Sequence, residues 1–434
     1  KDTPLAFGKF QDFLGGLVKG QLSRFADNAI PTMDELLVKL MGNTGEVSAA
    51  VAARELLDLY SQSDDETKLA FFQNLEQDFN AIQTGVDEAY ANYSKNPSSS
   101  NLNKLSRAAE PRRHELMRRL NQTPGATHDL VSMRTDLLRF TKEYPELKAV
   151  DETFVRLFTS WFGRSFLVLQ TIDWSTSASI LNRIIRYEAV HAIKDWDDLR
   201  SRIDRPNRRC FAFFHPALSD EPLIFVEVAL GMDVPGSINS ILEDTAERDS
   251  DTSKFTTATF YSISNCQPGL KNITFGNFLI KQVVQELQAE FPSIKNFVTL
   301  SPIPGFRRWL DADSEEEAEE VSAQKALVRS LPDTIESIAE HGESIRRLVF
   351  NYLVQAKKGK YPADPVTRFH LGNGALIHQL HSSADLSEKG RAQSYGAMVN
   401  YLYDLRFIER NHENYVTQGS VEYSDKLKSL LYKP

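Results

Sequence analysis

The chain has 434 residues, enough for two or three domains, and its 41% apolar and 25% charged residues are ordinary for a globular protein. Its formal net charge of −9 argues against a general attraction to nucleic acid or to anionic membranes. No apolar run approaches the roughly 20 residues of a membrane span, and two cysteines, Cys210 and Cys266, are too few for a disulfide framework. We therefore expect no nucleic-acid partner, no membrane partner and a reducing compartment.

The first 150 residues have the pattern of helices almost throughout. The segment ETKLAFFQNLEQDFNAI places one apolar stripe at helical spacing, and it consists of Leu69, Phe72, Leu75, Phe79 and Ile82. Ser63 and Glu66 in front of it have the spacing of a capping box. NPSSSN at 96–101 and Pro111 interrupt the helical pattern. This part predicts a helical bundle used for packing or assembly, and residues 151–169 predict a long helix that leads to the next domain.

After Arg209 the sequence changes to β-rich runs bounded by turn residues. CFAFFHP, PLIFVEVAL and TTATFYSI predict three strands, FLIKQVVQELQAEF predicts a helix, and FVTL predicts a further strand that ends at Ser301. The buried side of this helix is predicted to consist of Leu279, Ile280, Val283, Val284 and Leu287. Strands joined through a crossover helix indicate an α/β or α+β domain.

The last third of the chain begins with an acidic insert, DADSEEEAEEVSAQKALVRS. Consecutive acids point around a helix rather than into one site, so we expect a solvated helix face there and no metal site. IRRLVFNYLVQAK predicts a helix, RFHLGNGALIH an irregular glycine-rich segment, and QSYGAMVNYLYDL another helix.

One segment that could carry chemistry is NCQPGLKNITFGNFLIK at 265–281, between a strand and a helix. Backbone amides freed by Gly269 and Gly276 at a helix N-terminus could bind an anion. The spacing matches neither a dinucleotide-binding fingerprint nor a P-loop, so a plain glycine turn is the alternative. Lys271 and Lys281 are candidates for contacts with phosphate groups, and equally could be ordinary surface lysines.

The second candidate is Ser301 in FVTLSPIPGF. Open α/β sheets place ligands at the carboxyl ends of their strands, and Ser301 follows such a strand. Pro302 holds Ser301 extended, which keeps its hydroxyl in one direction. Since no GxSxG motif is present, the segment does not support a hydrolase nucleophile, and a turn serine is the alternative.

The third candidate is His370 in RFHLGNGALIH, because histidine is the usual general acid or base near neutral pH. A structural histidine is the alternative. His378 and His381 are close in sequence, but they lack HExxH spacing and a helix-borne carboxylate partner. We therefore expect no metal site.

Several segments together resemble the malonyl-CoA decarboxylase family in order and separation. They are YEAVHAIKDWDDLRSRI, NRRCFAFFHP, FYSIS, GLKNITFGNFLIKQVVQELQAEFP, LSPIPGF and FHLGNGA, and LSPIPGF is the most specific. The resemblance is strong over about residues 150–405 and loose in the helical first part. It implies a multidomain α and α+β protein: a helical bundle for oligomerisation at 1–158, followed by an acetyltransferase-like (GNAT-type) α/β catalytic domain at 159–434.

The resemblance also implies an activity and a site. Family members convert malonyl-CoA to acetyl-CoA and carbon dioxide without a metal or organic cofactor, and they assemble as tetramers. Ser301 and His370 would be the catalytic pair, with Ser262, Tyr403 and Asn373 in support. The substrate-binding segment would be Lys271, Asn272, Ile273, Thr274, Phe275, Gly276 and Asn277. Some members carry a glutamate where this chain has Thr274, so the role of that carboxylate would be unfilled or moved here.

The chemistry of the residues agrees with this expectation. Loss of carbon dioxide from a malonyl thioester leaves an enolate, which backbone amides of the 271–277 segment could stabilise and His370 could protonate. Two alternatives remain: a CoA-dependent acyltransferase and a non-catalytic CoA-binding scaffold. Residues 1–20 lack a secretory signal and LYKP is no peroxisomal signal, so we expect a cytoplasmic protein, or a mitochondrial one if a leader was removed.

Overall fold

The computed structural model describes residues 31–42, 45–163, 166–218, 220–243, 251–273, 279–312 and 318–432. The chain divides into two compact units, which are described separately. The first comprises Lys1–Leu167, His215–Ser219 and Gln267–Phe275, and the second comprises Val168–Phe214, Asp220–Cys266 and Gly276–Pro434. Two short segments from the later part of the chain therefore pack with the helices of the first unit.

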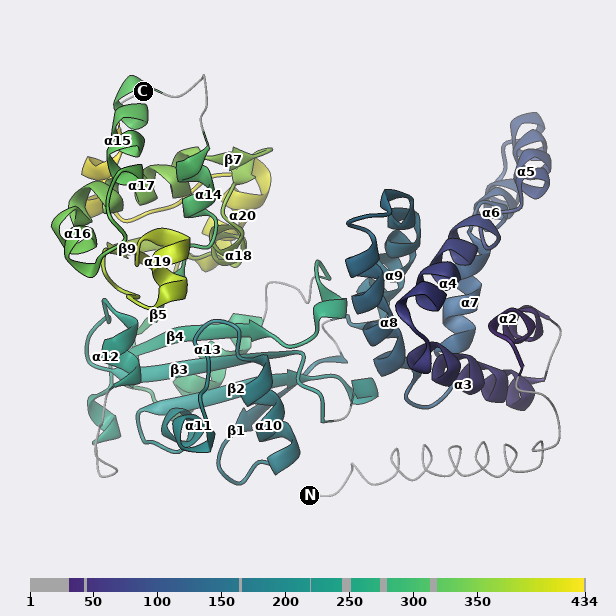
Figure 1. Ribbon diagram of the computed structural model, residues 1–434, viewed down its shortest axis with the longest axis horizontal. Coiled ribbons are helices and arrows are strands. Elements are labelled where there is room, and N and C mark those ends of the chain that lie inside the picture. Colours follow the sequence, from purple (N-terminus) through teal and green to yellow (C-terminus); the bar gives the residue numbers. More distant parts are fainter. Residues whose placement is uncertain are drawn as a thin grey trace. The chain divides into compact units, whose positions relative to one another are not determined.

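The first unit is helical in its described residues (Figure 1). Its helices are α2 (Met33–Met41), α3 (Glu46–Gln62), α4 (Asp65–Gln77), α5 (Gln83–Lys95), α6 (Ser99–Ala108), α7 (Arg112–Leu120), α8 (Ala126–Phe140) and α9 (Lys148–Trp161). Its described residues also include the 3₁₀ turn η1 (Pro145–Leu147) and, from the two later segments, η3 (Pro216–Leu218) and η5 (Pro268–Leu270). Buried leucine and phenylalanine side chains of α3, α4, α7, α8 and α9 fill the space between these helices.

The predicted start of α4 was wrong by one residue. Asp64, not Ser63, is the N-cap, and its carboxylate accepts a hydrogen bond from the Thr67 amide at 2.9 Å. The predicted stripe was also partly wrong, because α4 ends at Gln77 and Ile82 beyond it is exposed. Phe71 is buried in its place, beside Phe72.

The second unit is built on a mixed sheet with strand order β1-β2-β3-β4-β5-β10-β6, to which β9 adds by pairing with β10. The strands are β1 (Val168–Ile172), β2 (Arg208–Phe214), β3 (Ile224–Gly231), β4 (Thr257–Asn265), β5 (Asn296–Thr299), β6 (Ser301–Pro302), β9 (Leu376–His381) and β10 (Met398–Leu402). Strands β4 and β5 pair in parallel, and the other pairs are antiparallel. A separate two-stranded ribbon consists of β7 (Lys357–Lys358) and β8 (Tyr361–Pro362).

Helices α10 and α11 pack on one face of the sheet through a core that includes Cys210 and Phe225 (Figure 1). The described helices of this unit are α10 (Ala178–Tyr187), α11 (Trp196–Ile203), α12 (Ile238–Leu242), α13 (Leu279–Glu290), α14 (Phe306–Asp311), α15 (Glu319–Arg329), α16 (Ile335–Glu340), α17 (Gly342–Gln355), α18 (Pro365–Gly372), α19 (Glu388–Ser394) and α20 (Ile408–Gln418). The 3₁₀ turns are η4 (Thr252–Lys254) and η6 (Asp425–Leu430). All five residues predicted for the buried side of α13 are buried, which confirms that part of the prediction.

Two predicted helices were wrong. Residues 151–169 do not form one helix, because α9 ends at Trp161 and β1 begins at Val168. The segment QSYGAMVNYLYDL contains strand β10 instead of a helix, because residues 398–402 pair with β9, β5 and β6. Tyr395 and Gly396, with left-handed φ angles of 51° and 72°, end α19 just before it. The segment predicted as irregular around His370 is helix α18 followed by β9.

The order of the predicted fold class is confirmed: a helical region precedes an α/β domain built on a mixed sheet. Within the described ranges, no helix is both long enough and apolar enough to span a membrane.

Candidate active site

Ser301 lies where two parallel strands of the sheet stop pairing. The register of β4 and β5 ends at Phe260 opposite Thr299, and the Leu300 amide still donates to the Phe260 carbonyl at 3.0 Å. From Ser301 onward the chain pairs instead with Val399 of β10. The Ser301 side chain is 6% exposed, and its hydroxyl donates to Thr299 Oγ1 at 2.8 Å. The serine hydroxyl is therefore buried and already hydrogen-bonded.

The stiff turn after Ser301 has a structural cause. Ile303 is fully buried, and α14 begins directly after Gly305. A Cβ atom on Gly305 would overlap the Tyr352 hydroxyl, so any other residue there would force Tyr352 to move. The Gly305 amide donates to Asp364 Oδ2 at 3.3 Å, which connects this turn to the start of α18.

Helix α18 carries His370 in its last turn. Asp364 is its N-cap and accepts hydrogen bonds from the amides of Val366 and Thr367, both at 2.9 Å, while Pro365 occupies the first helical position. At the other end, the His370 carbonyl accepts from the amides of Asn373 and Ala375 at 3.1 Å. The backbone around His370 is thus fixed at both ends of a short helix.

A chain of hydrogen bonds runs through the His370 ring. Its Nε2 lies 3.2 Å from Ser301 Oγ, and its Nδ1 lies 2.7 Å from the Tyr403 hydroxyl. Because Ser301 uses its one hydroxyl proton on Thr299, Nε2 of His370 is the donor to Ser301 Oγ. Nδ1 then accepts the proton of Tyr403. The neutral ring with its proton on Nε2 satisfies every group in this chain.

Burial sets the charge of this site. His370 is 3% exposed, and desolvation lowers its pKa to about 3, so the ring is neutral at neutral pH in the free protein. Burial also raises the pKa of Tyr403 well above its ordinary value, so the phenol keeps its proton. The Tyr401 ring stacks on His370 with centroids 4.5 Å apart, and its hydroxyl lies 2.7 Å from Thr367 Oγ1.

Ser262 belongs to a second polar network. Its hydroxyl lies 2.8 and 2.9 Å from the two carboxylate oxygens of Glu188 and 3.3 Å from Ser264 Oγ. Opposite Ser262 on β3 is Glu227, which is fully buried. Burial and the charge of Glu188 raise the pKa of Glu227 to about 8, although Arg202 at 3.4 Å opposes this shift. In the described part of the chain, no hydrogen bond joins Ser262 to the Ser301–His370 pair.

The two serines nevertheless occupy equivalent places relative to the paired strands β4 and β5. Ser262 and Ser301 each follow by two residues the last pair of the β4–β5 register, Phe260 and Thr299. The structure therefore places both beyond the point where the parallel strands separate.

The remaining predicted site residues lie in different places. Tyr403 follows strand β10 rather than a helix, so its predicted element was wrong although its side chain contacts His370. Asn373 ends α18, and its side-chain amide donates to the Phe369 carbonyl at 2.7 Å rather than to the His370 ring. Lys271, Asn272 and Ile273 belong to the helical unit, and Thr274, Phe275, Gly276 and Asn277 lie outside the described residues.

Residues 31–42, 45–163, 166–218, 220–243, 251–273, 279–312 and 318–432 contain no group of three or more His, Cys, Asp or Glu side chains arranged for a metal ion. His381 Nε2 contacts Asn400 Oδ1, and His378 Nδ1 contacts Ser424 Oγ at 3.0 Å. The two histidines therefore have polar side-chain partners of their own within the fold.

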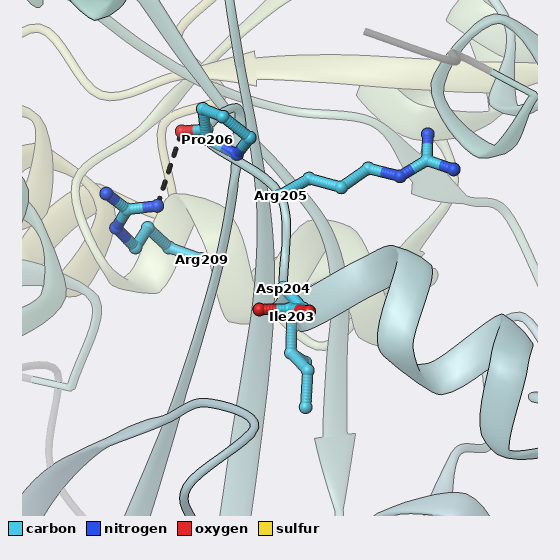
Figure 2. Close-up of a pocket in the computed structure, with 5 residues that line it drawn as sticks. All are labelled: Ile203, Asp204, Arg205, Pro206 and Arg209. Atoms are coloured by element: carbon cyan, nitrogen blue, oxygen red, sulfur yellow. Dashed lines mark hydrogen bonds between the residues drawn. The ribbon is translucent and has the colours of Figure 1, made fainter. Parts of the chain in front are cut away.

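A surface pocket lies elsewhere in the second unit. Figure 2 shows that it is lined by Ile203, Asp204, Arg205, Pro206 and Arg209. Arg209 Nη1 donates to the Pro206 carbonyl at 3.3 Å, and its guanidinium also pairs with Glu290 of α13. Since neither Ser301 nor His370 lines this pocket, it is separate from the site described above.

Four residues around the predicted site were not identified from the sequence: Thr299, Tyr401, Asp364 and Glu188. Thr299 and Tyr401 read as ordinary strand residues, and only the fold brings them to Ser301 and His370. Asp364 carried a usable signal, because Asp followed by Pro is typical of a helix N-terminus. Glu188 stands in the segment YEAVH, but nothing local distinguishes it from a surface acid.

Comparison with known proteins places the chain in a family. Residues 165–434 match the model of the malonyl-CoA decarboxylase C-terminal domain, and residues 79–162 match that of the N-terminal domain. The structure is similar to that of malonyl-CoA decarboxylase from Rhodopseudomonas palustris, with 45% identity and a TM-score of 0.86 over 92% of this chain and 98% of the other. The corresponding structure from Agrobacterium vitis shares 43% identity, with a TM-score of 0.84 over 92% of this chain and 100% of the other.

Curated relatives agree with this result. The mitochondrial malonyl-CoA decarboxylase of Anser anser anser is 34% identical over 351 residues, which cover 74% of this chain and 69% of that protein. The mouse protein of the same name is 32% identical over 360 residues, which cover 76% of this chain and 73% of that protein. These matches define an enzyme class, the carboxy-lyases. Within this class, the chain belongs to the malonyl-CoA decarboxylase family, which confirms the resemblance drawn from its motifs.

Proposed function

We propose that this protein decarboxylates malonyl-CoA to acetyl-CoA and carbon dioxide, with Ser301 and His370 as the catalytic pair. The observation that carries the site assignment is the buried hydrogen-bond chain from Thr299 through Ser301 and His370 to Tyr403. Membership of the malonyl-CoA decarboxylase family, through models that cover most of the chain, supports the reaction.

The reaction requires the site to stabilise a negative charge and to supply a proton. When the bond between C2 and the carboxylate breaks, its electron pair moves onto C2 and the thioester oxygen as an enolate. Hydrogen-bond donors must stabilise that oxygen, and an acid must protonate C2. The thioester is itself the electron sink, so we propose that the reaction uses no metal and no organic cofactor. One proton is taken from solution for each molecule of carbon dioxide released.

In this proposal Ser301 is a hydrogen-bond donor and not a nucleophile. In the free protein His370 Nε2 donates to Ser301 Oγ, which is opposite to the direction needed to activate a serine. The Ser301 hydroxyl can rotate from Thr299 to the carboxylate or the thioester oxygen of the substrate. His370 continues to hold Ser301 Oγ during that rotation.

His370 is the proposed acid that protonates C2, and it acquires its proton when substrate arrives. A neutral ring with a pKa of about 3 has no proton to give as an imidazolium. A malonyl carboxylate placed beside it in a buried site raises the pKa of the ring by charge interaction. When C2 receives the proton, the negative charge has left the site, and the pKa of His370 falls back.

The proposal extends to the supporting residues. Tyr403 fixes the tautomer of His370 through Nδ1, and the motif resemblance supports Ser262 and Asn373 as further supporting residues. Lys271 through Asn277 bind the CoA thioester, and the ammonium groups of Lys271 and Lys281 suit the CoA phosphates. What supports the assignment of this segment is the motif resemblance.

We further propose a helical oligomerisation domain at 1–158, a catalytic domain at 159–434 and a homotetramer. The two family models match residues 79–162 and 165–434, so the boundary between them lies near residue 163. This boundary and the division into two compact units support the proposed domains. For location, the proposal is a cytoplasmic protein, or a mitochondrial one if a leader was removed. The goose and mouse relatives are named as mitochondrial.

One assay tests the function. Purified protein is mixed with malonyl-CoA in buffer alone, and carbon dioxide and acetyl-CoA are followed. Equimolar formation of both is expected. An acyltransferase would instead require an added amine acceptor, and a scaffold would bind malonyl-CoA without turning it over.

A further inference from the structure

A buried arginine in the helical unit holds the backbone where the proposed substrate-binding segment begins. Arg134 lies in α8, and its side chain is fully buried. Its Nη1 donates to the carbonyls of Gly269 and Lys271 at 2.7 and 2.9 Å. The guanidinium is neutralised by Asp151 of α9, with Nε 2.7 Å from Oδ1 and Nη2 3.4 Å from Oδ2.

Gly269 brings the same segment into direct contact with α8. A Cβ atom at Gly269 would overlap the carbonyl of Val131, so only glycine allows the backbone of η5 to lie this close to the helix. Val131 stands one turn before Arg134, so both contacts come from the same face of α8. The segment is fixed by a close backbone approach and by a charged donor together.

The chain beyond Gly269 is also held in one conformation. The Ile273 amide donates to the Leu270 carbonyl at 3.0 Å, and the Ile273 side chain is buried. Between them Asn272 adopts a left-handed φ of 65°, which the third position of a type II turn requires and asparagine tolerates. The two carbonyls held by Arg134, those of Gly269 and Lys271, both precede Asn272 in the chain.

We propose that Arg134 is a positioning residue for substrate binding: it fixes the backbone of Gly269–Lys271 and thereby orients the exposed Lys271 and Asn272 toward malonyl-CoA, while the buried Ile273 side chain anchors the segment. This inference rests on the proposed function, in which that segment binds the CoA thioester. Arg134 does not itself touch the substrate. The helical unit then contributes to substrate affinity, in addition to any role in assembly.

The test compares Arg134→Met with a matched variant, Arg113→Met. Arg113 lies in α7 of the same unit, is 5% exposed, and its Nε donates to Thr153 Oγ1 at 3.0 Å, with no contact to residues 267–273 among its hydrogen bonds. Both variants lose a buried arginine. We expect Arg134→Met to raise the KM for malonyl-CoA and the Kd for acetyl-CoA at least tenfold while kcat changes less than threefold. Arg113→Met should lower the Tm but leave the KM and Kd within twofold of the original protein.

Two further variants keep the test decisive if Arg134→Met does not fold. Arg134→Lys keeps a charge beside Asp151 but cannot span both carbonyls and the carboxylate. Its KM should therefore lie between that of the original protein and that of Arg134→Met. Gly269→Ala should raise the KM by pushing the segment away from Val131. A lowered Tm with unchanged KM and Kd in Arg134→Lys and Gly269→Ala would overturn the proposal. Acetyl-CoA affinity is measured by calorimetry, so a failure of the decarboxylase assignment would appear separately, as absent turnover in the unchanged protein.

Discussion

At the scale of single residues, burial decides what the catalytic pair can do. His370, Ser301 and Tyr403 are each no more than 6% exposed, and their polar atoms are satisfied by one another and by Thr299. A buried neutral imidazole costs less free energy than a buried imidazolium, which is why the pKa of His370 falls to about 3. The same burial means that a substrate carboxylate beside His370 would shift the pKa of the ring strongly, because the charge of the carboxylate is poorly screened there.

The first prediction concerns three of the four residues of the hydrogen-bond chain, namely Ser301, His370 and Tyr403. His370→Ala and Ser301→Ala should each lower kcat at least ~100-fold, the usual scale for an acid or an enolate-stabilising donor. Tyr403→Phe should lower kcat about tenfold, because it removes one hydrogen bond that fixes the tautomer of His370. Steady-state kinetics with circular dichroism as a check on folding provide the measurement. Near-native kcat in a folded Ser301→Ala or His370→Ala protein would remove that residue from the pair.

The second prediction follows from the lowered pKa of His370. The pKa in the folded protein, about 3, lies below the unfolded value of ~6.5, so this residue stabilises the fold above pH ~6.5 and the stabilisation is lost as the pH falls toward 3. Between pH 7 and pH 4.5 the loss from this residue should be about 2–3 kcal/mol. Urea unfolding of the original protein and of His370→Asn at both pH values measures it.

The variant should lose correspondingly less stability over that interval, because asparagine does not titrate. The pH profile of kcat/KM for the original protein should show no ionisation near pH 6.5 that belongs to His370. Any ionisation seen there should therefore also be present in a His370 variant. Equal acid sensitivity of the two proteins would mean that His370 is solvated and charged at pH 4.5.

At the scale of elements, α18 shows which local signals predict structure and which do not. The segment around His370 was predicted as irregular because Gly372 and Gly374 outweighed a short helical pattern. The signal at the other end, Asp364 followed by Pro365, is that of a helix start, and the structure has a helix there. Strand β10 was predicted as part of a helix. It is a strand because residues 398–402 pair with β9, β5 and β6, and these long-range partners leave no local signal.

The third prediction tests the N-cap of α18. Asp364→Ala removes acceptors for the amides of Gly305, Val366 and Thr367 and for the Thr367 hydroxyl, all in a buried place. We expect a loss of about 2–4 kcal/mol in the free energy of unfolding. The value of kcat should fall at least tenfold, since the cap joins the turn after Ser301 to the helix of His370.

A matched control is Asp195→Ala, which removes the N-cap of α11, whose carboxylate accepts from the Asp198 amide at 2.8 Å. Asp195 lies on the surface and contacts neither Ser301 nor His370, so about 1 kcal/mol of stability should be lost with kcat unchanged. An equal effect of the two substitutions on kcat would show that the Asp364 cap has no special connection to the site.

At the scale of the whole molecule, the order of helical and mixed parts could be predicted, because amphipathic spacing and β-rich runs are local properties of the chain. Strands β2 to β5 and helix α13 follow from such runs. The packing of Gly269 against α8 could not be predicted, because its partner Arg134 is 135 positions away and neither residue stands in a recognisable motif. The hydrogen bonds of His370 could not be derived from local patterns either, because Ser301 and Tyr403 lie far from it in sequence. Only the family resemblance had placed these three residues in one site.

The last prediction concerns metal dependence. The thioester accepts the electron pair released with carbon dioxide, so the chemistry requires an oxyanion donor and an acid rather than a Lewis acid. In the described part of the chain no three potential ligands are grouped, and His378 and His381 contact Ser424 and Asn400. Prolonged dialysis against a strong chelator should leave kcat and KM within twofold of the untreated protein. Elemental analysis before and after dialysis verifies that any metal has been removed. Loss of activity that returns with added zinc or magnesium, but not with buffer alone, would contradict the metal-free mechanism and would point to ligands outside the described residues.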